Sequence, residues 1–330
     1  MHEKRVYDSI LDVIGHTPMV RLNRITEGLP CSVWAKLEFL NPMGSCKDRI
    51  AKYLVEQAER DGRLKPGDTI LENSSGNTAM GLALMAIQKG YRLKAVVRDR
   101  TSKEKLDQLQ ALGVDVVKVD TSLPPEHPDS YNRITPRLAQ ELPHCYFPDQ
   151  HNNRENNQAH YLSTGAEIWE QMEGRVDAVV VGMGTGGTVG GVGHYLKERD
   201  PKVKVVAVDV EGSVFTEYFR TGKVGASHPY LLEGLGDEFL IGTADFSVID
   251  AMIQVSDRDA FHAARRLARQ EGLLVGGSSG AAIWGVRQVA AKLGHKARIV
   301  TVFPDGASRY LSTVFSDDWM RAQGFLAPEL

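Results

Sequence analysis

Lys47 is the residue of this chain whose position most directly suggests covalent chemistry. It lies within residues 41–49, where a Gly/Ser turn leads straight into apolar residues at helical spacing, namely Ile50, Ala51, Leu54, Val55 and Ala58. Gly62 ends the pattern, so Lys47 is expected in the first turn of a helix. The helix macrodipole and any desolvation favour a neutral amine there, the form that attacks carbonyls and forms Schiff bases. A solvated surface lysine is the alternative reading of this single position.

A second candidate is the polar loop that follows the next apolar run. Residues 72–78 read Glu-Asn-Ser-Ser-Gly-Asn-Thr and open a helix that contains Met80, Leu82 and Leu84. Backbone N–H groups and hydroxyls at a helix start can bind a carboxylate or a phosphate. A simple Ser/Asn helix cap is the alternative for this segment.

A third candidate is a glycine-rich loop at residues 182–188, which read Gly-Met-Gly-Thr-Gly-Gly-Thr. It lies between a buried strand and a helix, and its glycines allow the backbone to approach an anion closely, as in a phosphate cradle. The loop also satisfies G-x-G-x-x-G, and the next strand ends at Asp209, where a dinucleotide fold has its ribose-binding acid. A nicotinamide-dependent dehydrogenase is therefore a rival interpretation.

A fourth loop, Gly276-Gly277-Ser278-Ser279-Gly280, matches the hydrolase elbow G-x-S-x-G. The order of residues along the chain argues against a hydrolase. The only histidine after Ser278 is His295, and no Asp or Glu lies between them, so the order nucleophile, acid, histidine cannot be formed. A glycine-lined helix start and a cofactor contact both remain open for this loop.

The alternation of apolar segments predicts the framework that positions these loops. Strands are expected at residues 69–71, 93–97, 114–119, 178–181, 203–208 and 299–303. Helices are expected between and beside them, at residues 78–89, 102–112, 156–171, 188–198, 258–271 and 279–293. Prolines make residues 120–136 an expected irregular segment, with Pro124, Pro125 and Pro136 among them. The predicted class is α/β, with two domains at 1–150 and 151–330, each a mostly parallel sheet flanked by helices. About the first 40 residues could pack on the second domain, and the cleft between domains is the expected ligand site.

Composition excludes several classes of protein. The 330 residues are 42% hydrophobic and carry a net charge of −3, which provides no basic surface for nucleic acid. Residues 1–5 lead into no apolar run, and residues 178–193 are too interrupted by glycine to span a bilayer, so a cytoplasmic protein without a membrane partner is expected. Three cysteines without a CxxC pair, and no HExxH spacing, predict neither a disulfide scaffold nor a metal site. Cys46 is expected to be a small buried hydrophobic residue.

Together the four motifs resemble the pyridoxal-phosphate β-family of cysteine synthases and cystathionine β-synthases, which is tryptophan synthase β-like (fold type II). The matching segments are Gly-Ser-Cys-Lys-Asp-Arg at 44–49, Ser-Ser-Gly-Asn-Thr at 74–78, Gly-Thr-Gly-Gly-Thr at 184–188 and Gly-Gly-Ser-Ser-Gly-Ala-Ala at 276–282. The resemblance covers nearly the whole chain, from 10–18 through 233–236 to 304–305 and 309–310. Residues 316–320, and Asp149-Gln150 before an Asn-rich loop, favour the cystathionine β-synthase branch.

The resemblance implies a role for each loop. Lys47 would hold pyridoxal 5'-phosphate as a Schiff base, Asn77 would bond its ring hydroxyl, and Ser278 would face its pyridine nitrogen. A neutral hydroxyl at that nitrogen favours β-elimination over deeper carbanion chemistry. The cofactor phosphate would lie in a cradle of Gly184, Thr185, Gly186, Gly187 and Thr188. The carboxylate of an amino acid substrate would be held by Ser74, Ser75, Gly76, Thr78 and Gln150.

The implied reaction is a ping-pong β-replacement. Lys47, freed by the incoming amino acid, would remove the α-proton, and loss of a β-leaving group would give an α-aminoacrylate. A thiol would then form a C–S bond at the β-carbon of serine, O-acetylserine or O-phosphoserine, as in a cystathionine β-synthase. Sulfide as nucleophile, as in a cysteine synthase, and an amine nucleophile are alternatives. A dehydrogenase, and a catalytically silent binding protein on this fold, are the rivals from other classes.

Departures from the family pattern concern the second substrate. Ser74 stands where the family usually has Thr, His151 follows the glutamine, and Arg98 stands where proline is common. Asp237 could pair with the ammonium group of an amino acid nucleophile, or be an exposed loop acid. Arg98 and Arg100 could steer an anionic leaving group, or be solvated surface charges. A homodimer is expected from the resemblance. The chain has no room for a haem-binding N-terminal extension or a C-terminal regulatory module, so control by those routes is not expected.

Overall fold

The computed structural model describes residues 6–123, 127–294 and 296–327, and the chain divides into two compact units. Unit 1 comprises the described part of Met1–His16 together with Leu40–Glu155. Unit 2 comprises Thr17–Phe39 together with the described part of Asn156–Leu330. The chain therefore passes between units at 16/17, 39/40 and 155/156, whereas the sequence interpretation divides it after residue 150 and allows about the first 40 residues to pack on the second domain. Residues 1–5, Pro124, Pro125 and His295, which entered the sequence interpretation, lie outside the described residues.

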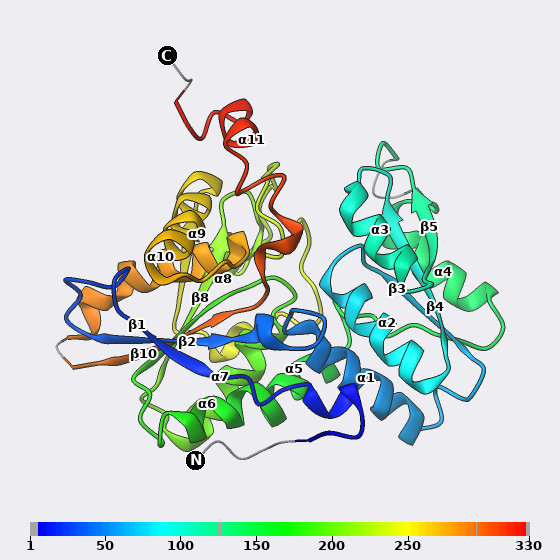
Figure 1. The fold of residues 1–330 in the computed structure, drawn as a ribbon, viewed down its shortest axis with the longest axis horizontal. Coiled ribbons are helices and arrows are strands. Elements are labelled where there is room, and N and C mark those ends of the chain that lie inside the picture. Colours follow the sequence, from blue (N-terminus) through cyan, green and yellow to red (C-terminus); the bar gives the residue numbers. More distant parts are fainter. Residues whose placement is uncertain (1–5, 124–126, 295, 328–330) are drawn as a thin grey trace. The chain divides into compact units, whose positions relative to one another are not determined.

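Unit 1 is built on a parallel sheet (Figure 1). Its strands, in the order in which they lie side by side among the described residues, are β5 (Asp115–Val119), β4 (Arg92–Arg98), β3 (Thr69–Asn73) and β6 (Cys145–Tyr146). Its helices are α1 (Lys47–Arg60), α2 (Asn77–Lys89), α3 (Lys103–Ala111) and α4 (Tyr131–Glu141), with a 3₁₀ turn at Ile10–Val13. Successive strand residues point to opposite faces. Leu93, Ala95 and Val97 thus pack with α1 and α2, whereas Val96 packs towards α4.

Helix α4 corrects the sequence interpretation, which treats residues 120–136 as irregular. The helix begins at Tyr131 and contains Pro136. Tyr131, Ile134 and Leu138 recur at helical spacing and pack against the buried face of the sheet. Proline removes one backbone hydrogen bond from a helix interior. Packing of the apolar face outweighs that loss here, which local sequence rules cannot show.

Unit 2 is built on a larger, mostly parallel sheet (Figure 1). Among the described residues its strands lie in the order β1 (Met19–Leu22), β2 (Ser32–Leu37), β10 (Arg298–Phe303), β7 (Ala178–Gly182), β8 (Lys204–Val210) and β9 (Ala251–Val255). Only the β1–β2 pair is antiparallel within this described sheet. Its helices are α5 (Glu155–His160), α6 (Ala166–Gln171), α7 (Gly187–Arg199), α8 (Phe215–Thr221), α9 (Asp257–Glu271), α10 (Gly277–Leu293) and α11 (Asp317–Ala322). Short 3₁₀ turns occur at Glu38–Leu40, Phe246–Val248 and Ala307–Arg309.

Both faces of the unit 2 sheet are buried. Val179 and Val181 of β7 lie in the core formed with α6, α7 and α8, whereas Ala178 and Val180 lie in the core formed with α9 and α10. A strand that is buried on both faces reads as a continuous apolar run, as residues 178–181 do. The predicted α/β class, with two mostly parallel sheets flanked by helices, is confirmed.

The helix predicted at residues 156–171 is interrupted. Helix α5 ends at His160, a π-helical turn spans Tyr161–Gly165, and α6 continues from Ala166. A π-turn inserts one extra residue into the helix and often lies at a functional site. Apolar periodicity does not reveal a single inserted residue, so the interruption is visible only in the structure.

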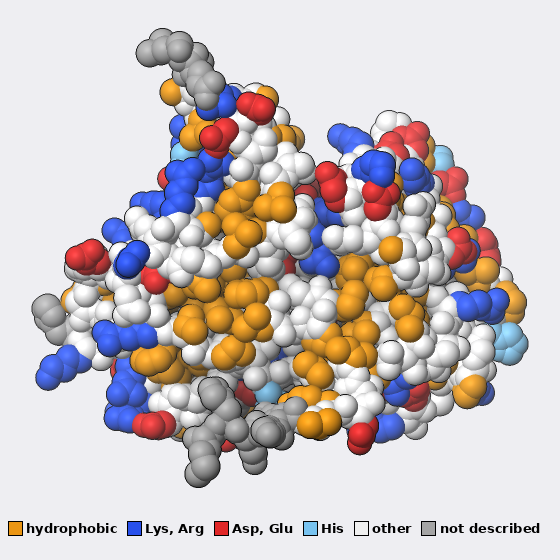
Figure 2. Space-filling model, in the orientation of Figure 1, with side chains coloured by type: hydrophobic (Ala, Val, Ile, Leu, Met, Phe, Trp, Pro, Cys, Tyr) orange, Lys and Arg blue, Asp and Glu red, His pale blue; other side chains and the backbone are white. Residues whose placement is uncertain are grey.

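The surface shows no continuous basic region on the face drawn in Figure 2 around α3 and β5, where acidic and basic side chains are interspersed. Lys103 pairs with Asp107 on α3, and Lys94 pairs with Asp115 across the neighbouring strands. No helix in the described part of the chain is long and apolar enough to cross a membrane.

A buried lysine joins β2 of unit 2 to α6. The Lys36 side chain is 0% exposed, and its Nζ lies 2.6 Å from Glu167 Oε2. The same amine donates to the Thr17 carbonyl oxygen at 2.5 Å and to Gln171 Oε1 at 2.9 Å. A charge removed from water requires such partners, because an unpaired buried charge costs several kcal/mol.

We predict that Lys36→Met destabilises the protein by about 3–5 kcal/mol, because it leaves the Glu167 carboxylate buried without its counter-charge. Urea denaturation followed by circular dichroism would measure the change. Adding Glu167→Gln to Lys36→Met should recover much of the loss. The exposed Lys103→Met is the control and should change stability little. Equal effects of Lys36→Met and Lys103→Met would contradict the prediction.

Candidate functional site

Lys47 is the first residue of α1, as the sequence predicts, and it is half-buried. The preceding turn is held by its own polar groups. Ser45 Oγ accepts a hydrogen bond from the Lys47 backbone N–H at 3.2 Å, and Asp48 Oδ2 accepts one from the Met43 N–H at 2.6 Å. Gly44 adopts φ +80°, a conformation that favours glycine. Cys46 is 2% exposed, which confirms that it is buried. The start of α1 is therefore a fixed platform for the lysine.

Helices α1 and α2 approach each other closely at these starts. A Cβ added at Gly81 of α2 would lie 3.0 Å from the Lys47 carbonyl oxygen and 3.0 Å from Ala51 Cβ. Gly81 is one helical turn beyond Asn77, which is the first residue of α2. The contact thus brings the backbone of Lys47 close to the helix start that carries Asn77.

The loop before α2 gathers the residues predicted to hold a substrate carboxylate. Ser74 Oγ accepts from the backbone N–H groups of Gly76, at 3.3 Å, and Ala79, at 3.4 Å. Thr78 Oγ1 donates to Gln150 Oε1 at 2.5 Å. The structure therefore brings Ser74, Thr78 and Gln150 to one helix start, with Ser75, Gly76 and Asn77 half-buried beside them. A helix N-terminus of this kind can bind an anion such as a carboxylate.

Sequence reasoning missed the residue that supports Gln150. Glu72 of β3 is fully buried, and its Oε1 accepts from the Asn73 N–H at 3.1 Å while its Oε2 accepts from the Gln150 N–H at 3.3 Å. Burial raises the pKa of Glu72 to about 8, partly offset by these backbone hydrogen bonds. The only signal in the sequence is an acidic residue directly after the apolar strand.

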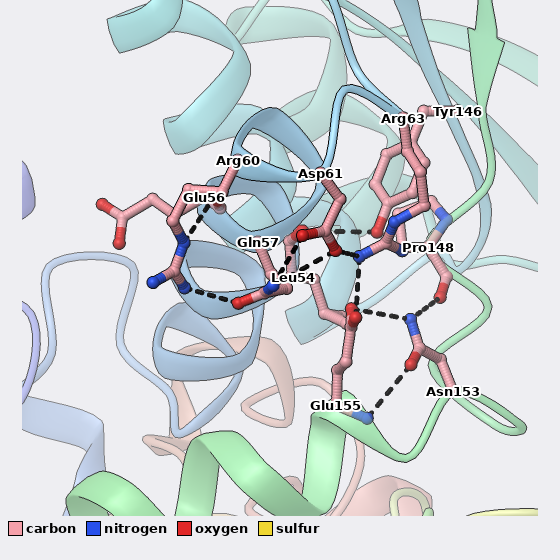
Figure 3. Close-up of polar contacts among 10 residues, drawn as sticks. All are labelled: Leu54, Glu56, Gln57, Arg60, Asp61, Arg63, Tyr146, Pro148, Asn153 and Glu155. Atoms are coloured by element: carbon pink, nitrogen blue, oxygen red, sulfur yellow. Dashed lines mark hydrogen bonds and ion pairs between the residues drawn. The ribbon is translucent and has the colours of Figure 1, made fainter.

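The segment that carries Gln150 is also tied to the end of α1 (Figure 3). Arg63 Nη2 donates to Asp61 Oδ2 at 2.9 Å and to Glu155 Oε1 at 2.7 Å. Asn153 Nδ2 donates to the Pro148 carbonyl oxygen at 3.1 Å and to Glu155 Oε2 at 3.2 Å. These hydrogen bonds join Pro148 and Glu155, on either side of Gln150, through Asn153, and they hold Glu155 to Arg63, just after α1.

In unit 2 the glycine-rich loop joins β7 to α7, and its glycines are required by close contacts. A Cβ at Gly184 would lie 2.2 Å from the Gly234 carbonyl oxygen, and one at Gly187 would lie 2.0 Å from Asn156 Oδ1. Gly186 adopts φ +79° at the cap of α7. The N–H groups of the first turn of a helix have no partner within the helix and can bind an anion.

Both threonines of this loop contact α5. Asn156 Nδ2 donates to Thr185 Oγ1 at 3.1 Å, and His160 Nε2 lies 3.1 Å from Thr188 Oγ1. Thr243 Oγ1 also donates to the Thr185 carbonyl oxygen at 2.5 Å. Sequence reasoning did not identify Asn156, His160 or Thr243, because these contacts join segments that are far apart in the sequence.

Ser278 lies in the first turn of α10 and is 5% exposed. The loop before it is packed tightly: a Cβ at Gly276 would lie 2.2 Å from Asp305 Oδ1. Asp305 Oδ2 accepts from the Tyr310 hydroxyl at 2.7 Å, and burial raises the pKa of Tyr310 well above its ordinary value. The neighbouring Ser279 Oγ is buried without a hydrogen-bond partner among the described residues.

One segment contacts both loops of unit 2. A Cβ at Gly277 would lie 2.7 Å from Leu232 Cδ1, and a Cβ at Gly184 would meet the Gly234 carbonyl oxygen. Residues 232–236 therefore lie against the start of α10 as well as against the loop at Gly184. The structure thus gathers five of the predicted residues in one turn, namely Gly184, Thr185, Gly186, Gly187 and Thr188. Residues 232–236 contact this turn and also the start of α10, which carries Ser278.

The acid expected of a dinucleotide site is engaged elsewhere. Asp209 is 0% exposed, and its Oδ2 accepts from the Thr216 N–H at 2.9 Å and from Thr216 Oγ1 at 2.7 Å. Its Oδ1 accepts from the Val210 N–H at 2.9 Å. Burial raises the pKa of Asp209. A carboxyl enclosed in this way cannot bind a ribose, which argues against the dehydrogenase.

The charged residues that depart from the family pattern make local contacts. Arg98 and Arg100 are exposed; the Arg98 guanidinium lies 4.8 Å from the centroid of the Tyr131 ring, and Arg100 Nε donates to Thr121 Oγ1 at 2.8 Å. Asp237 is half-buried, and its Oδ1 accepts from the backbone N–H groups of Glu238, at 2.7 Å, and Phe239, at 3.3 Å. His151 is half-buried beside Gln150.

Comparison with known proteins gives these features a context. Residues 10–305 match the family described as "Pyridoxal-phosphate dependent enzyme". The chain is 42% identical over 327 residues to the cystathionine beta-synthase of Apis mellifera and 43% identical over 328 residues to that of Rattus norvegicus. These alignments cover 98% and 99% of this chain but only 64% and 58% of those two proteins. The chain is also 41% identical over 308 residues to a cysteine synthase of Staphylococcus aureus (strain Mu50 / ATCC 700699), covering 93% of this chain and 96% of that protein.

We predict that Glu72 makes stability depend on pH. Its pKa is raised in the folded protein, so the folded state keeps a proton that the unfolded state has lost between about pH 4.5 and 8. Stability from this group therefore falls as pH rises through that interval, by at most about 1.4 kcal/mol per pH unit. Urea midpoints measured at pH 5 and pH 8 should show a loss in the native protein that Glu72→Gln lacks. Equal slopes in both proteins would contradict the prediction.

Proposed function

Because the chain belongs to the pyridoxal-phosphate dependent enzymes, we propose that it catalyses β-replacement, forming a C–S bond at the β-carbon of serine or an activated serine. The names of its relatives, cystathionine beta-synthase and cysteine synthase, support this reaction class. The observation that carries the proposal is the convergence of Ser74, Thr78 and Gln150 on the start of α2, which packs closely against the start of α1 at Lys47. This arrangement suits the carboxylate of an amino acid beside a reactive amine.

The residues of the chain fit the cofactor. The turn at Gly184, Thr185, Gly186, Gly187 and Thr188 opens helix α7, and the backbone N–H groups of such a helix start can bind a phosphate. Ser278 at the start of α10 makes no hydrogen bond through its side chain with the described residues, so its hydroxyl is available to a ring nitrogen. We propose that the cradle binds the phosphate of pyridoxal 5'-phosphate, Ser278 its ring nitrogen and Asn77 its ring hydroxyl.

Each residue would then have a defined task. Pyridoxal phosphate, when bound, supplies an electron sink that stabilises negative charge at the α-carbon of an amino acid. Lys47 holds the cofactor covalently through Nζ, and the freed amine later takes and returns the α-proton. Ser74, Ser75, Gly76, Thr78 and Gln150 hold the substrate carboxylate and so orient its α-carbon. The neutral hydroxyl of Ser278 leaves the ring nitrogen without a formal counter-ion, which favours β-elimination and replacement.

The proposed substrates are serine and a thiol amino acid, as for a cystathionine β-synthase. A cysteine synthase, with sulfide as nucleophile, is the second candidate, because the alignment with the Staphylococcus aureus protein covers 96% of that relative. The enclosure of Asp209 disfavours a dehydrogenase. A cytoplasmic location and a homodimeric state are part of the same proposal, and fractionation and light scattering would test them.

We predict that Lys47→Ala abolishes covalent attachment of pyridoxal phosphate and lowers turnover at least about 10²-fold, because it removes both the Schiff-base amine and the base. Borohydride reduction followed by peptide mass spectrometry would locate the cofactor, and product formation would give the rate. Lys52→Ala is the matched control on the same helix, since Lys52 pairs with Glu56. Cofactor trapped in Lys47→Ala at its normal peptide would refute the assignment.

We also predict that serine supports product formation and that homocysteine is the best nucleophile. Purified protein would be offered serine, O-acetylserine or O-phosphoserine, each with homocysteine, sulfide, cysteine or an amine. Mass spectrometry would identify the products. Preference for sulfide with O-acetylserine would establish the cysteine synthase alternative, and lack of β-elimination from all three donors would remove the proposed reaction.

A further inference from the structure

Helix α5 presents two polar side chains to the glycine-rich loop of α7. Asn156 and His160 are both 0% exposed and lie four residues apart, on one face of the helix. Asn156 Nδ2 donates to Thr185 Oγ1 at 3.1 Å. His160 Nε2 lies 3.1 Å from Thr188 Oγ1. Each threonine of the loop is thus contacted by a side chain of α5.

The glycines of α7 make this contact possible. A Cβ at Gly187 would meet Asn156 Oδ1 at 2.0 Å, and a Cβ at Gly191 would lie 2.8 Å from His160 Cβ. On the other side, Gly165 of the π-helical turn admits Tyr195 of α7, whose Cβ would lie 2.7 Å from an added Cβ. Helix α5 therefore lies against the α7 backbone, and its side chains have little freedom to turn away.

The hydrogen atoms of this arrangement follow from the chemistry of its groups. The amide nitrogen of Asn156 can only donate, so Thr185 Oγ1 accepts from it and retains its own hydrogen for another acceptor. A neutral histidine has one donor and one acceptor nitrogen. His160 Nδ1 lies 2.8 Å from Thr164 Oγ1. If Thr164 donates to Nδ1, the ring proton is on Nε2. His160 Nε2 then donates to Thr188 Oγ1, just as Asn156 donates to Thr185 Oγ1.

The opposite tautomer would have the opposite effect on the loop. With its proton on Nδ1, His160 would donate to Thr164 and accept the Thr188 hydrogen at Nε2. Thr188 would then present only lone pairs to the helix start. Lone pairs repel an anion, whereas a hydroxyl hydrogen forms a charge-assisted bond with it. A phosphate in the loop therefore selects the Nε2–H form.

We propose that His160 is a positioning residue which, together with Asn156, orders the loop hydroxyls so that Thr185 and Thr188 both donate to the phosphate of the cofactor. This inference rests on the proposed function, since it assumes that the phosphate binds at this loop. The π-helical turn has a part in it, because it places the Thr164 hydroxyl beside Nδ1, where it can donate to that nitrogen when the ring proton is on Nε2. His160 touches neither substrate nor reacting atoms in this role.

The test compares two ligands that differ only in the phosphate. Apoprotein would be titrated with pyridoxal phosphate and with pyridoxal, and the dissociation constants measured by absorbance. His160→Leu should weaken pyridoxal phosphate about tenfold and leave pyridoxal unchanged, because only the hydrogen bond to the phosphate is lost. His160→Gln retains a side-chain N–H donor and should restore most of the affinity. In a Thr188→Val background, His160→Leu should have no further effect.

Controls keep the inference separate from folding and from the proposed function. His194→Leu removes a histidine of α7 whose side chain is 44% exposed and pairs with Asp245, and it should leave both affinities unchanged. In the native holoprotein, ¹⁵N spectra should show His160 with its proton on Nε2. An Nδ1–H tautomer, or equal loss of both ligands in His160→Leu, would overturn the inference while pyridoxal phosphate binding by the native protein still supports the proposed function. Failure of the native protein to bind pyridoxal phosphate would overturn both.

Discussion

The contact between Gly187 and Asn156 is the constraint on which the unit 2 site depends. The space beside the Gly187 Cα is occupied by the Asn156 amide, so that even a methyl group is excluded. The same closeness holds the start of α7 in place and sets the direction of the Thr185 hydroxyl. A loop fixed in this way does not have to reorganise when an anion arrives, which is the advantage of preorganised donors. The glycines therefore admit the supporting helix, and in the proposed function they would also leave the backbone N–H groups open to the phosphate.

Each of the two units has a fully buried carboxyl group near the end of a strand. Glu72 at the end of β3 and Asp209 in β8 are both enclosed, and each accepts hydrogen bonds from backbone N–H groups. Backbone donors in a loop that lies within the protein must find acceptors, because an unpaired buried N–H costs free energy. In unit 1 this carboxyl holds the Gln150 backbone. In unit 2 it holds the start of α8 at Thr216. An acidic residue after a strand is therefore weak evidence for a ribose site unless its exposure is known.

Local patterns predicted the parts of the fold that short-range physics determines. The strand at β7 was visible as an apolar run, and the starts of α1, α2, α7 and α10 were visible as Gly/Ser turns before helical periodicity. Long-range packing determined the rest. Residues 17–39 join unit 2 because β2 pairs with β10, with Ser32 opposite Arg298. Helix α4 forms around Pro136 because its apolar face is covered. Glu72, Asn156 and His160 make contacts that no rule of sequence spacing can predict.

The local contacts of the charged residues bear on the choice of substrate. An arginine that steers an anionic leaving group should keep its guanidinium available, whereas Arg98 stacks on Tyr131 and Arg100 bonds Thr121. The cation–π contact of Arg98 is worth only about 0.5–1 kcal/mol at an exposed site, so it does not lock the side chain. Neither arginine, however, is oriented towards a phosphate group by these contacts. Asp237 Oδ1 likewise accepts hydrogen bonds from the backbone N–H groups of the turn that follows it. If the chain catalyses the proposed β-replacement, neither arginine is held ready for an anionic leaving group, so serine, whose leaving group carries no phosphate, fits the proposal better than O-phosphoserine.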